Sequence, residues 1–144
     1  MDCRLEQYQL KVLVWREAMA TFFCPGCWHD FNEDLIRCPN CGLVIHEFWN
    51  SKDYLEKLIL ALRHPEPTTP VRAAWLLGKI GDPRAVVSLI EIVKETDDLY
   101  LAREAIKALG AIDTPQARHF IRTLANHPAR MIRAEAGAAL STKK

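Results

Sequence analysis

Two pairs of cysteines near the N-terminus constrain this chain more than any other feature. Cys24 and Cys27 form one Cys-Pro-x-Cys segment, and Cys38 and Cys41 form a second one after ten further residues. Proline fixes φ and favours a tight turn, so each segment brings two thiolates together on one turn. Two such turns supply four sulfur ligands, the usual set of a closed structural zinc site. The spacing therefore predicts one structural zinc ion held by Cys24, Cys27, Cys38 and Cys41.

Disulfide bonds are the alternative use of these cysteines. A bridge within Cys-x-x-Cys is strained, and the sequence begins without a secretory signal pattern. We therefore expect a cytoplasmic protein, in which thiolates stay reduced and available to metal. No run of residues is apolar enough to span a membrane, so we expect no membrane partner. Cys3, the fifth cysteine, lies too far upstream to join the cluster by local spacing and is interpreted as an ordinary free thiol.

Residues 24–50 are predicted to form a small β module around the metal. Polar turn formers between Phe31 and the pair Leu35-Ile36 predict a hairpin between the two cysteine turns, and residues 43–49 are expected to form another strand. These features resemble a zinc ribbon. That resemblance implies a module too small to fold by burial alone, so the metal would supply much of its folding free energy. His29 and His46 could each replace a ligand, but four cysteines already suffice.

Residues 4–23 are predicted to form an amphipathic helix. Apolar residues recur at alternating steps of three and four, at Leu5, Tyr8, Val12, Trp15, Met19 and Phe22. The polar face mixes basic and acidic side chains, whereas a helix that lies on a membrane has a strongly basic face. We therefore expect residues 1–23 to form a packing helix.

The rest of the chain, residues 51–144, shows an internal repeat. Residues 73–82 align with residues 105–113 and with residues 136–141. Gly78 and Gly110 are 32 residues apart, and Gly110 and Ser141 are 31 apart. A proline follows each glycine after five residues, at the expected first position of the next helix, where its missing N–H has no cost. Further repeated pairs support the period: Leu58-Ile59 with Leu89-Ile90 and Phe120-Ile121, and His64-Pro65 with His127-Pro128.

Residues 71–90 closely resemble a short HEAT-like repeat of the phycobilisome-lyase type. The resemblance rests on an arginine on the first helix and on an alanine-rich core. It also rests on three sequence segments, Leu-Gly-Lys-Ile-Gly-Asp, Pro-Arg-Ala-Val and Leu-Ile. It extends over roughly residues 51–141 and is weakest in the third copy. It implies a mainly α fold, a short α-solenoid of helix pairs, with the small β zinc ribbon attached. Residues 4–23 could then be the first helix of the first repeat, with the ribbon inserted after it; the alternatives are a ribbon that stands apart, and a helix that pairs with another subunit.

Enzyme activity is not expected. Dinuclear-iron hydroxylases built from such repeats use several His-Glu pairs on helices, whereas this chain has one, His46-Glu47, in a predicted strand. A lyase acting on tetrapyrroles needs a chromophore cavity and acidic groups, and no such constellation is evident. The sequence also lacks a phosphate-binding glycine loop and a nucleophile elbow. A lyase-type or other HEAT-repeat enzyme component is therefore the least favoured interpretation.

A nucleic-acid-associated zinc-ribbon protein is the main alternative. Trp28, Phe31, Phe48 and Trp49 could stack on bases. However, residues 24–50 contain four acidic residues and one basic residue, which disfavours contact with phosphates, and the whole chain has a net charge of only +1. These aromatic residues are better interpreted as the core of the module and its seam with the helices.

The sequence therefore favours a non-enzymatic scaffold or adaptor that binds a protein partner. Helix-pair solenoids present extended curved surfaces for this purpose. The family resemblance implies that the second helix of each pair lines the concave side, and the expected contact residues there are Arg84, Ser88, Glu91, Arg118 and Arg122. Self-association through an end of the stack is a further option. The sequence does not identify the partner or decide between zinc and iron.

Overall fold

The computed structural model describes residues 21–141 and divides the chain into two compact units, residues 1–51 and residues 52–144. The described part is mainly helical, with a single small sheet, so the predicted fold class is confirmed. No helix within residues 21–141 combines the length and the apolarity needed to cross a membrane. The predicted N-terminal helix lies outside the described residues except at its end, where Phe22 and Phe23 are in a strand.

The described part of the first unit, residues 21–51, contains two short strands and one short helix. Strand β1 (Phe22–Phe23) pairs antiparallel with β2 (Asp30–Phe31), and Phe22 lies opposite Phe31. The two phenylalanine rings stack with their centroids 6.5 Å apart. Helix α2 (Ile45–Asn50) follows the second cysteine pair.

Two predictions for this unit are wrong. The strands flank the first cysteine turn, and the predicted hairpin between the two turns is not formed. Residues 43–49 were expected to be a strand, but most of them lie in α2, and His46-Glu47 is therefore helical. The apolar run Leu43-Val44-Ile45 was consistent with either structure, because short apolar runs do not distinguish a strand from a helix by periodicity.

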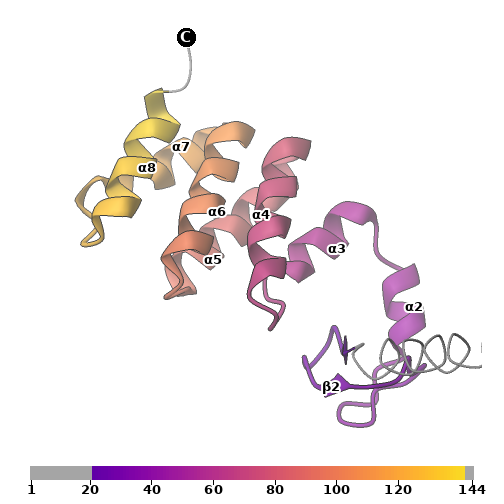
Figure 1. Cartoon of the computed structure of the whole chain (residues 1–144). Coiled ribbons are helices and arrows are strands. Elements are labelled where there is room, and N and C mark those ends of the chain that lie inside the picture. Colours follow the sequence, from indigo (N-terminus) through magenta and orange to yellow (C-terminus); the bar gives the residue numbers. More distant parts are fainter. Residues whose placement is uncertain (1–20, 142–144) are drawn as a thin grey trace, which may run out of the picture. The chain divides into compact units, whose positions relative to one another are not determined.

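The second unit is built from helices that alternate between two layers. Helices α4 (Thr68–Ile80), α6 (Leu99–Ile112) and α8 (Arg130–Ser141) pack side by side in one layer. Helices α5 (Val86–Glu95) and α7 (Pro115–Thr123) pack behind them, and α3 (Tyr54–Ala61) packs against α4 (Figure 1). Short 3-10 turns, η1 (Pro83–Ala85) and η2 (Leu124–Asn126), precede α5 and follow α7.

The core of this unit follows the sequence repeat. Ala73, Ala105 and Ala136 occupy equivalent places on α4, α6 and α8, and each is at most 2% exposed. Gly78 and Gly110 allow these helices to approach closely. A Cβ added at Gly78 would lie 2.8 Å from the Cα of Ala108, and one added at Gly110 would lie 2.9 Å from the Cβ of Ala139. The repeated glycine is therefore a packing residue between neighbouring repeats.

The helix ends follow the expected chemistry, with one correction. Helix α4 ends at Gly81, whose φ of 72° is left-handed, and Asp82 caps the turn that follows. The sequence predicts Asn50 or Ser51 as the cap of the helix after the metal module, with Asp53 placed for a reciprocal cap. The cap is instead Asp53, which accepts a hydrogen bond from the N–H of Glu56 while the Glu56 carboxylate accepts one from the N–H of Asp53. Such reciprocal capping satisfies two otherwise unpaired donors.

The His-Pro pairs also have a structural role. The Nδ1 atom of His64 accepts a hydrogen bond from the N–H of Glu66 at 3.0 Å, and Nδ1 of His127 accepts one from the N–H of Ala129 at 3.1 Å. The Thr96 hydroxyl oxygen likewise accepts a hydrogen bond from the N–H of Asp98. The His64 turn leads into α4, the His127 turn into α8 and the Thr96 turn into α6. The repeat therefore includes its connecting turns.

Candidate metal centre and surface of the helical unit

The two cysteine segments form turns of matching backbone geometry. The N–H of Cys24 donates to the carbonyl of His29, and the N–H of Cys38 donates to that of Leu43. The carbonyls of Cys24 and Cys38 accept from the N–H groups four residues later. The strand pair Phe23–Asp30 has its counterpart in the bridge between Arg37 and Val44. The second segment thus repeats the first with an offset of fourteen residues.

In each segment, the residue directly after the second cysteine has a left-handed backbone conformation. Gly42 has a φ of 77° and Trp28 has a φ of 58°. This conformation is readily adopted by glycine and is costly for a large side chain. Glycine at position 42 indicates this conformation in the sequence, whereas tryptophan at position 28 does not. Only the fourteen-residue offset would have indicated it.

The four sulfur atoms form a compact cluster. Each Sγ lies within 4.8 Å of the other three. The Sγ atoms of Cys24 and Cys41 are 3.5 Å apart, and those of Cys27 and Cys38 are 3.7 Å apart. A tetrahedral ion with Zn–S bonds of about 2.3 Å requires sulfurs about 3.8 Å apart, whereas a disulfide requires about 2.05 Å. The separations fit a shared metal ion, and the four cysteines are free thiols.

The first cysteine of each pair is buried and the second is accessible. Cys24 and Cys38 are at most 1% exposed and form the core of this unit with Ile45. Phe31 and Trp49 pack against that core, as predicted for core residues. His29 is exposed, and His46 contacts a carboxylate oxygen of Asp34 at 3.2 Å. Within the described residues, neither histidine belongs to the cluster of potential ligands.

The pKa values of the Cys24, Cys27 and Cys38 thiols are shifted in different directions. Burial raises the pKa of the Cys24 thiol to about 12. The Asn40 side-chain amide, which donates to the Cys27 sulfur at 3.5 Å, is the main cause that lowers the pKa of Cys27 to about 6. Burial opposes ionisation of Cys38, but backbone N–H groups of Cys41 and Asn40 lower its pKa overall. Asn40 is a supporting residue that sequence reasoning missed, since the x of Cys-Pro-x-Cys carries no general signal.

The second unit matches the family of HEAT repeats over residues 48–141. The chain belongs to the HEAT repeat family. This agrees with the resemblance that the sequence motifs indicated. No curated protein shows significant similarity to the chain.

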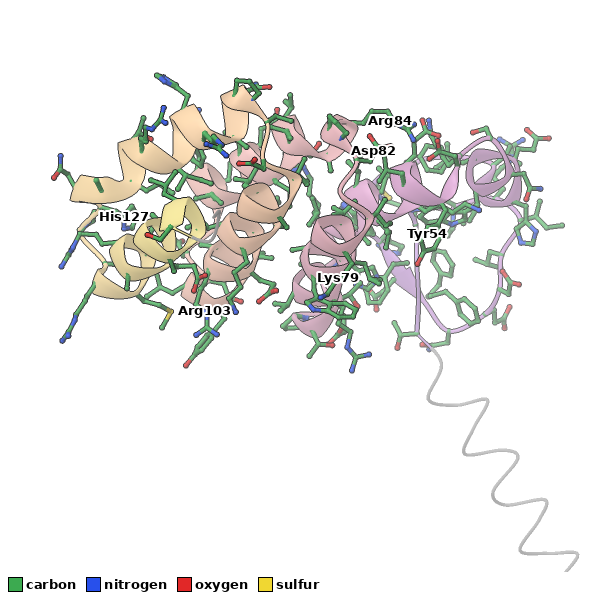
Figure 2. The ribbon with its side chains drawn as sticks, turned by 90° about the horizontal axis from the view of Figure 1, so that it is seen from above. Tyr54, Lys79, Asp82, Arg84, Arg103 and His127 are labelled. Carbon is green, nitrogen blue, oxygen red and sulfur yellow. The ribbon has the colours of Figure 1, made fainter. Side chains whose placement is uncertain are left out.

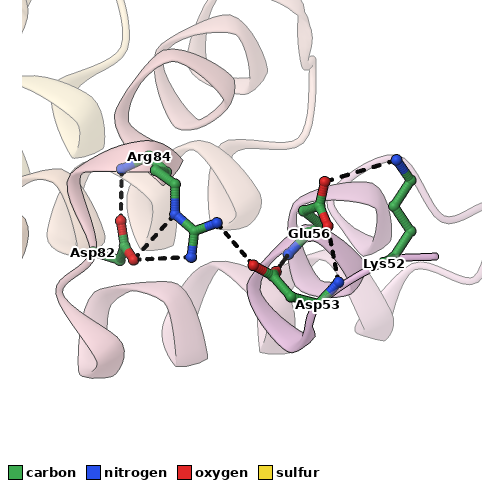
Figure 3. Close-up of polar contacts among 5 residues, drawn as sticks. All are labelled: Lys52, Asp53, Glu56, Asp82 and Arg84. Atoms are coloured by element: carbon green, nitrogen blue, oxygen red, sulfur yellow. Dashed lines mark hydrogen bonds and ion pairs between the residues drawn. The ribbon is translucent and has the colours of Figure 1, made fainter. Parts of the chain in front are cut away.

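Three of the five expected partner-contact residues on the HEAT repeats form ion pairs within the chain. Arg84 lies between Asp82 and Asp53, with its Nη1 2.8 Å from an Asp53 oxygen (Figure 3). Asp53 caps α3 and Asp82 caps η1, so Arg84 joins the start of α3 to the start of η1, the turn that leads into α5. This pairing raises the pKa of Arg84.

Glu91 and Arg118 are similarly engaged. Arg63 contacts Glu91 at 3.1 Å and Glu95 at 3.2 Å, which links the end of α3 to α5. Arg118 forms two hydrogen bonds with Asp113, the residue that ends α6. Ser88 is half-buried and Arg122 is exposed, and neither side chain is bonded within residues 21–141. The partners of Arg63 were missed because their positions depend on the stacking of repeats, whereas Asp113 is local to Arg118 and was overlooked.

Proposed function

We propose that this protein is a non-enzymatic interaction module, in which HEAT repeats present a binding surface and a cysteine module is organised by one structural zinc ion. The match of residues 48–141 to HEAT repeats supports the first part, because stacked repeats commonly serve as surfaces for protein partners. The helical unit has an apolar interior, and within residues 21–141 no polar or charged residue is buried. The chemistry that the described HEAT repeats offer therefore lies on their surface.

The zinc assignment rests on the ligand chemistry of the cluster. Four thiolates favour zinc or iron over hard cations such as magnesium. A closed set of four cysteines leaves no position for a substrate, so the proposed role of the ion is structural. Cys24, Cys27, Cys38 and Cys41 would hold it, and Asn40 would stabilise the Cys27 thiolate through its amide.

The proposed contact residues remain Arg84, Ser88, Glu91, Arg118 and Arg122. Arg122 and Ser88 are the stronger candidates, because a partner could engage them without breaking an internal ion pair. The other three residues would have to break an ion pair within this chain before they could form one with the partner. At an exposed site this exchange contributes little net free energy of binding.

Two measurements test this proposal. Metal analysis of protein purified without added metal should give about one zinc per chain. Affinity purification of the full chain from native cells should recover a reproducible protein partner, and nuclease treatment should leave that recovery unchanged. Recovery that nuclease abolishes, together with a mobility shift of nucleic acid that weakens steeply with salt, would support the alternative of a nucleic-acid-associated protein.

A further inference from the structure

A shallow groove lies between α4 and α6, on the face of the layer formed by α4, α6 and α8. Its floor is the close contact of Gly78 with Ala108, where the two backbones meet. Trp75 and Lys79 line the α4 side, and Glu104 and Lys107 line the α6 side. Figure 2 places Lys79 on one side of the helical unit and Arg84, with Asp82, on the opposite side. The groove is thus separate from the contact residues proposed above.

Trp75 departs from the repeat. When Gly78 is aligned with Gly110, Trp75 corresponds to Lys107 and Lys79 corresponds to Ala111. Since α6 has a lysine at the equivalent position, the stacking of helices does not require an aromatic residue there. Even so, Trp75 is 51% exposed, which leaves half of a large apolar side chain in water. Tryptophan at the edge of a pocket is the residue type most enriched at the energetic centres of protein interfaces.

Two cations on the same helix as Trp75 also lack acidic partners. The ammonium of Lys79 lies over the Trp75 ring, 5.5 Å from its centroid, and Arg72 is exposed one turn earlier on α4. Within residues 21–141 neither one forms an ion pair. Elsewhere on the helical unit, Arg84 has two carboxylate partners, and Arg103 of α6 contacts Glu135 of α8. Lys79 and Arg72 are therefore free to meet external carboxylates.

We propose that this groove binds a short acidic segment of a partner protein, with an apolar side chain of that segment packed on Trp75 and its carboxylates facing Lys79 and Arg72. The inference rests on the proposed function and identifies the surface and the chemistry of the ligand. Burial of the exposed part of the indole ring would supply affinity, and the two unpaired cations would select acidic sequences. The Glu104 carboxylate in the wall pairs with Lys107 at 3.5 Å, so its charge is balanced within the groove.

The test is a selection of short random peptides, displayed on phage, against the immobilised full chain. We expect the enriched peptides to carry Asp or Glu around a Leu, Phe or Trp residue. Synthetic versions labelled with fluorescein should bind in an anisotropy titration, and Trp75→Ala and Lys79→Glu should each weaken binding about tenfold or more. Tyr54→Ala and Arg130→Glu are matched controls, because they remove another exposed aromatic ring and reverse another exposed charge elsewhere. Helical circular dichroism verifies that each variant is folded.

The outcomes separate this inference from the proposed function. Peptides that bind with a dissociation constant unchanged by Trp75→Ala and Lys79→Glu, or peptides without acidic enrichment, overturn the groove assignment and leave an interaction module in place. Tight binding of a fluorescein-labelled single-stranded RNA that both variants abolish identifies a nucleic-acid surface and also overturns it. If no peptide is enriched and native purification yields no protein partner, the proposed function fails as well.

Discussion

The cysteine module and the HEAT repeats differ in what can hold them together. Within residues 21–51, the buried hydrophobic cluster of the module consists of Cys24, Cys38 and Ile45, and each strand is two residues long. The HEAT unit buries apolar residues from each of its helices, including Leu77, Leu89 and Ile106, which are fully buried. Apolar burial grows with the size of the core, so it can stabilise the second unit and cannot by itself stabilise the first.

This difference assigns separate roles to the two kinds of repeated sequence in the chain. The repeated Cys-Pro-x-Cys provides ligands, and its contribution to stability depends on an external ion. The HEAT repeat provides small residues at helix contacts and acidic caps at helix starts, and it needs no ion. Changes to the metal site should therefore affect one region only.

The largest effect is expected from loss of a metal ligand. Cys38→Ser should reduce the bound zinc to well below one ion per chain and unfold the module, because three thiolates and a weakly binding hydroxyl form an incomplete tetrahedral set. Limited proteolysis should then cleave within residues 21–51, while most of the helical circular dichroism remains. Cys3→Ser is the matched control and should change neither metal content nor the proteolysis pattern. Loss of most of the helicity in Cys38→Ser would contradict the separation of the two regions.

A pair of glycine variants sharpens the description of the HEAT repeats. Gly78→Ala should lower the free energy of unfolding by roughly 1–3 kcal/mol, because the new Cβ would overlap the backbone of Ala108. Gly137→Ala meets no atom within 4 Å and lies within α8, so it should raise that free energy by up to about 1 kcal/mol through helix propensity. Urea denaturation monitored by circular dichroism measures both. Equal effects of the two variants would rule out close helix packing as the role of Gly78.

Metal affinity should depend on pH in a defined direction. At neutral pH the Cys27 thiol, with a pKa of about 6, is largely ionised, whereas the Cys24 thiol, with a pKa of about 12, is protonated. Metal binding must displace that Cys24 proton, so zinc affinity should rise with pH, by roughly tenfold per pH unit for each proton released. Competition with a coloured chelator between mildly acidic and mildly basic pH measures this slope. A flat profile would mean that all four thiols are already ionised in the free protein.

The smallest effect is expected at the Arg84 ion pairs. A double-mutant cycle with Arg84→Met and Asp53→Asn keeps a capping acceptor at position 53 while it removes the charge pair. We expect a coupling free energy below about 1 kcal/mol, because both side chains are about half exposed. Thermal unfolding of the four proteins measures it. A coupling several times larger would mean that this contact determines how the repeats stack.

Much of this architecture could be predicted from the sequence because it depends on local and periodic signals. The spacing of Gly78, Gly110 and Ser141 gave the repeat, and Cys-Pro-x-Cys gave the cluster. The structure supplied the reasons: Gly78 permits a helix contact, and His64 and His127 each accept a hydrogen bond from a turn.

The errors arose where the sequence signal is ambiguous or non-local. Residues 43–49 combine β-branched and aromatic residues, yet Ile45–Asn50 is helical. Asn50, Ser51 and Asp53 are all suitable caps, and only Asp53 has a Glu three residues later to reciprocate. The ion pairs of Arg84 and Arg63 join residues about thirty positions apart, so they could not be found without the stacking geometry.

The most direct test compares the amide spectrum of the full isotope-labelled chain before and after metal removal by a strong chelator. We predict that resonances of residues 21–51 lose their dispersion, that those of residues 52–141 stay in place, and that stoichiometric zinc restores the first set. A spectrum in which residues 21–51 keep their dispersed resonances without metal, or in which the helical unit collapses with them, would contradict this account.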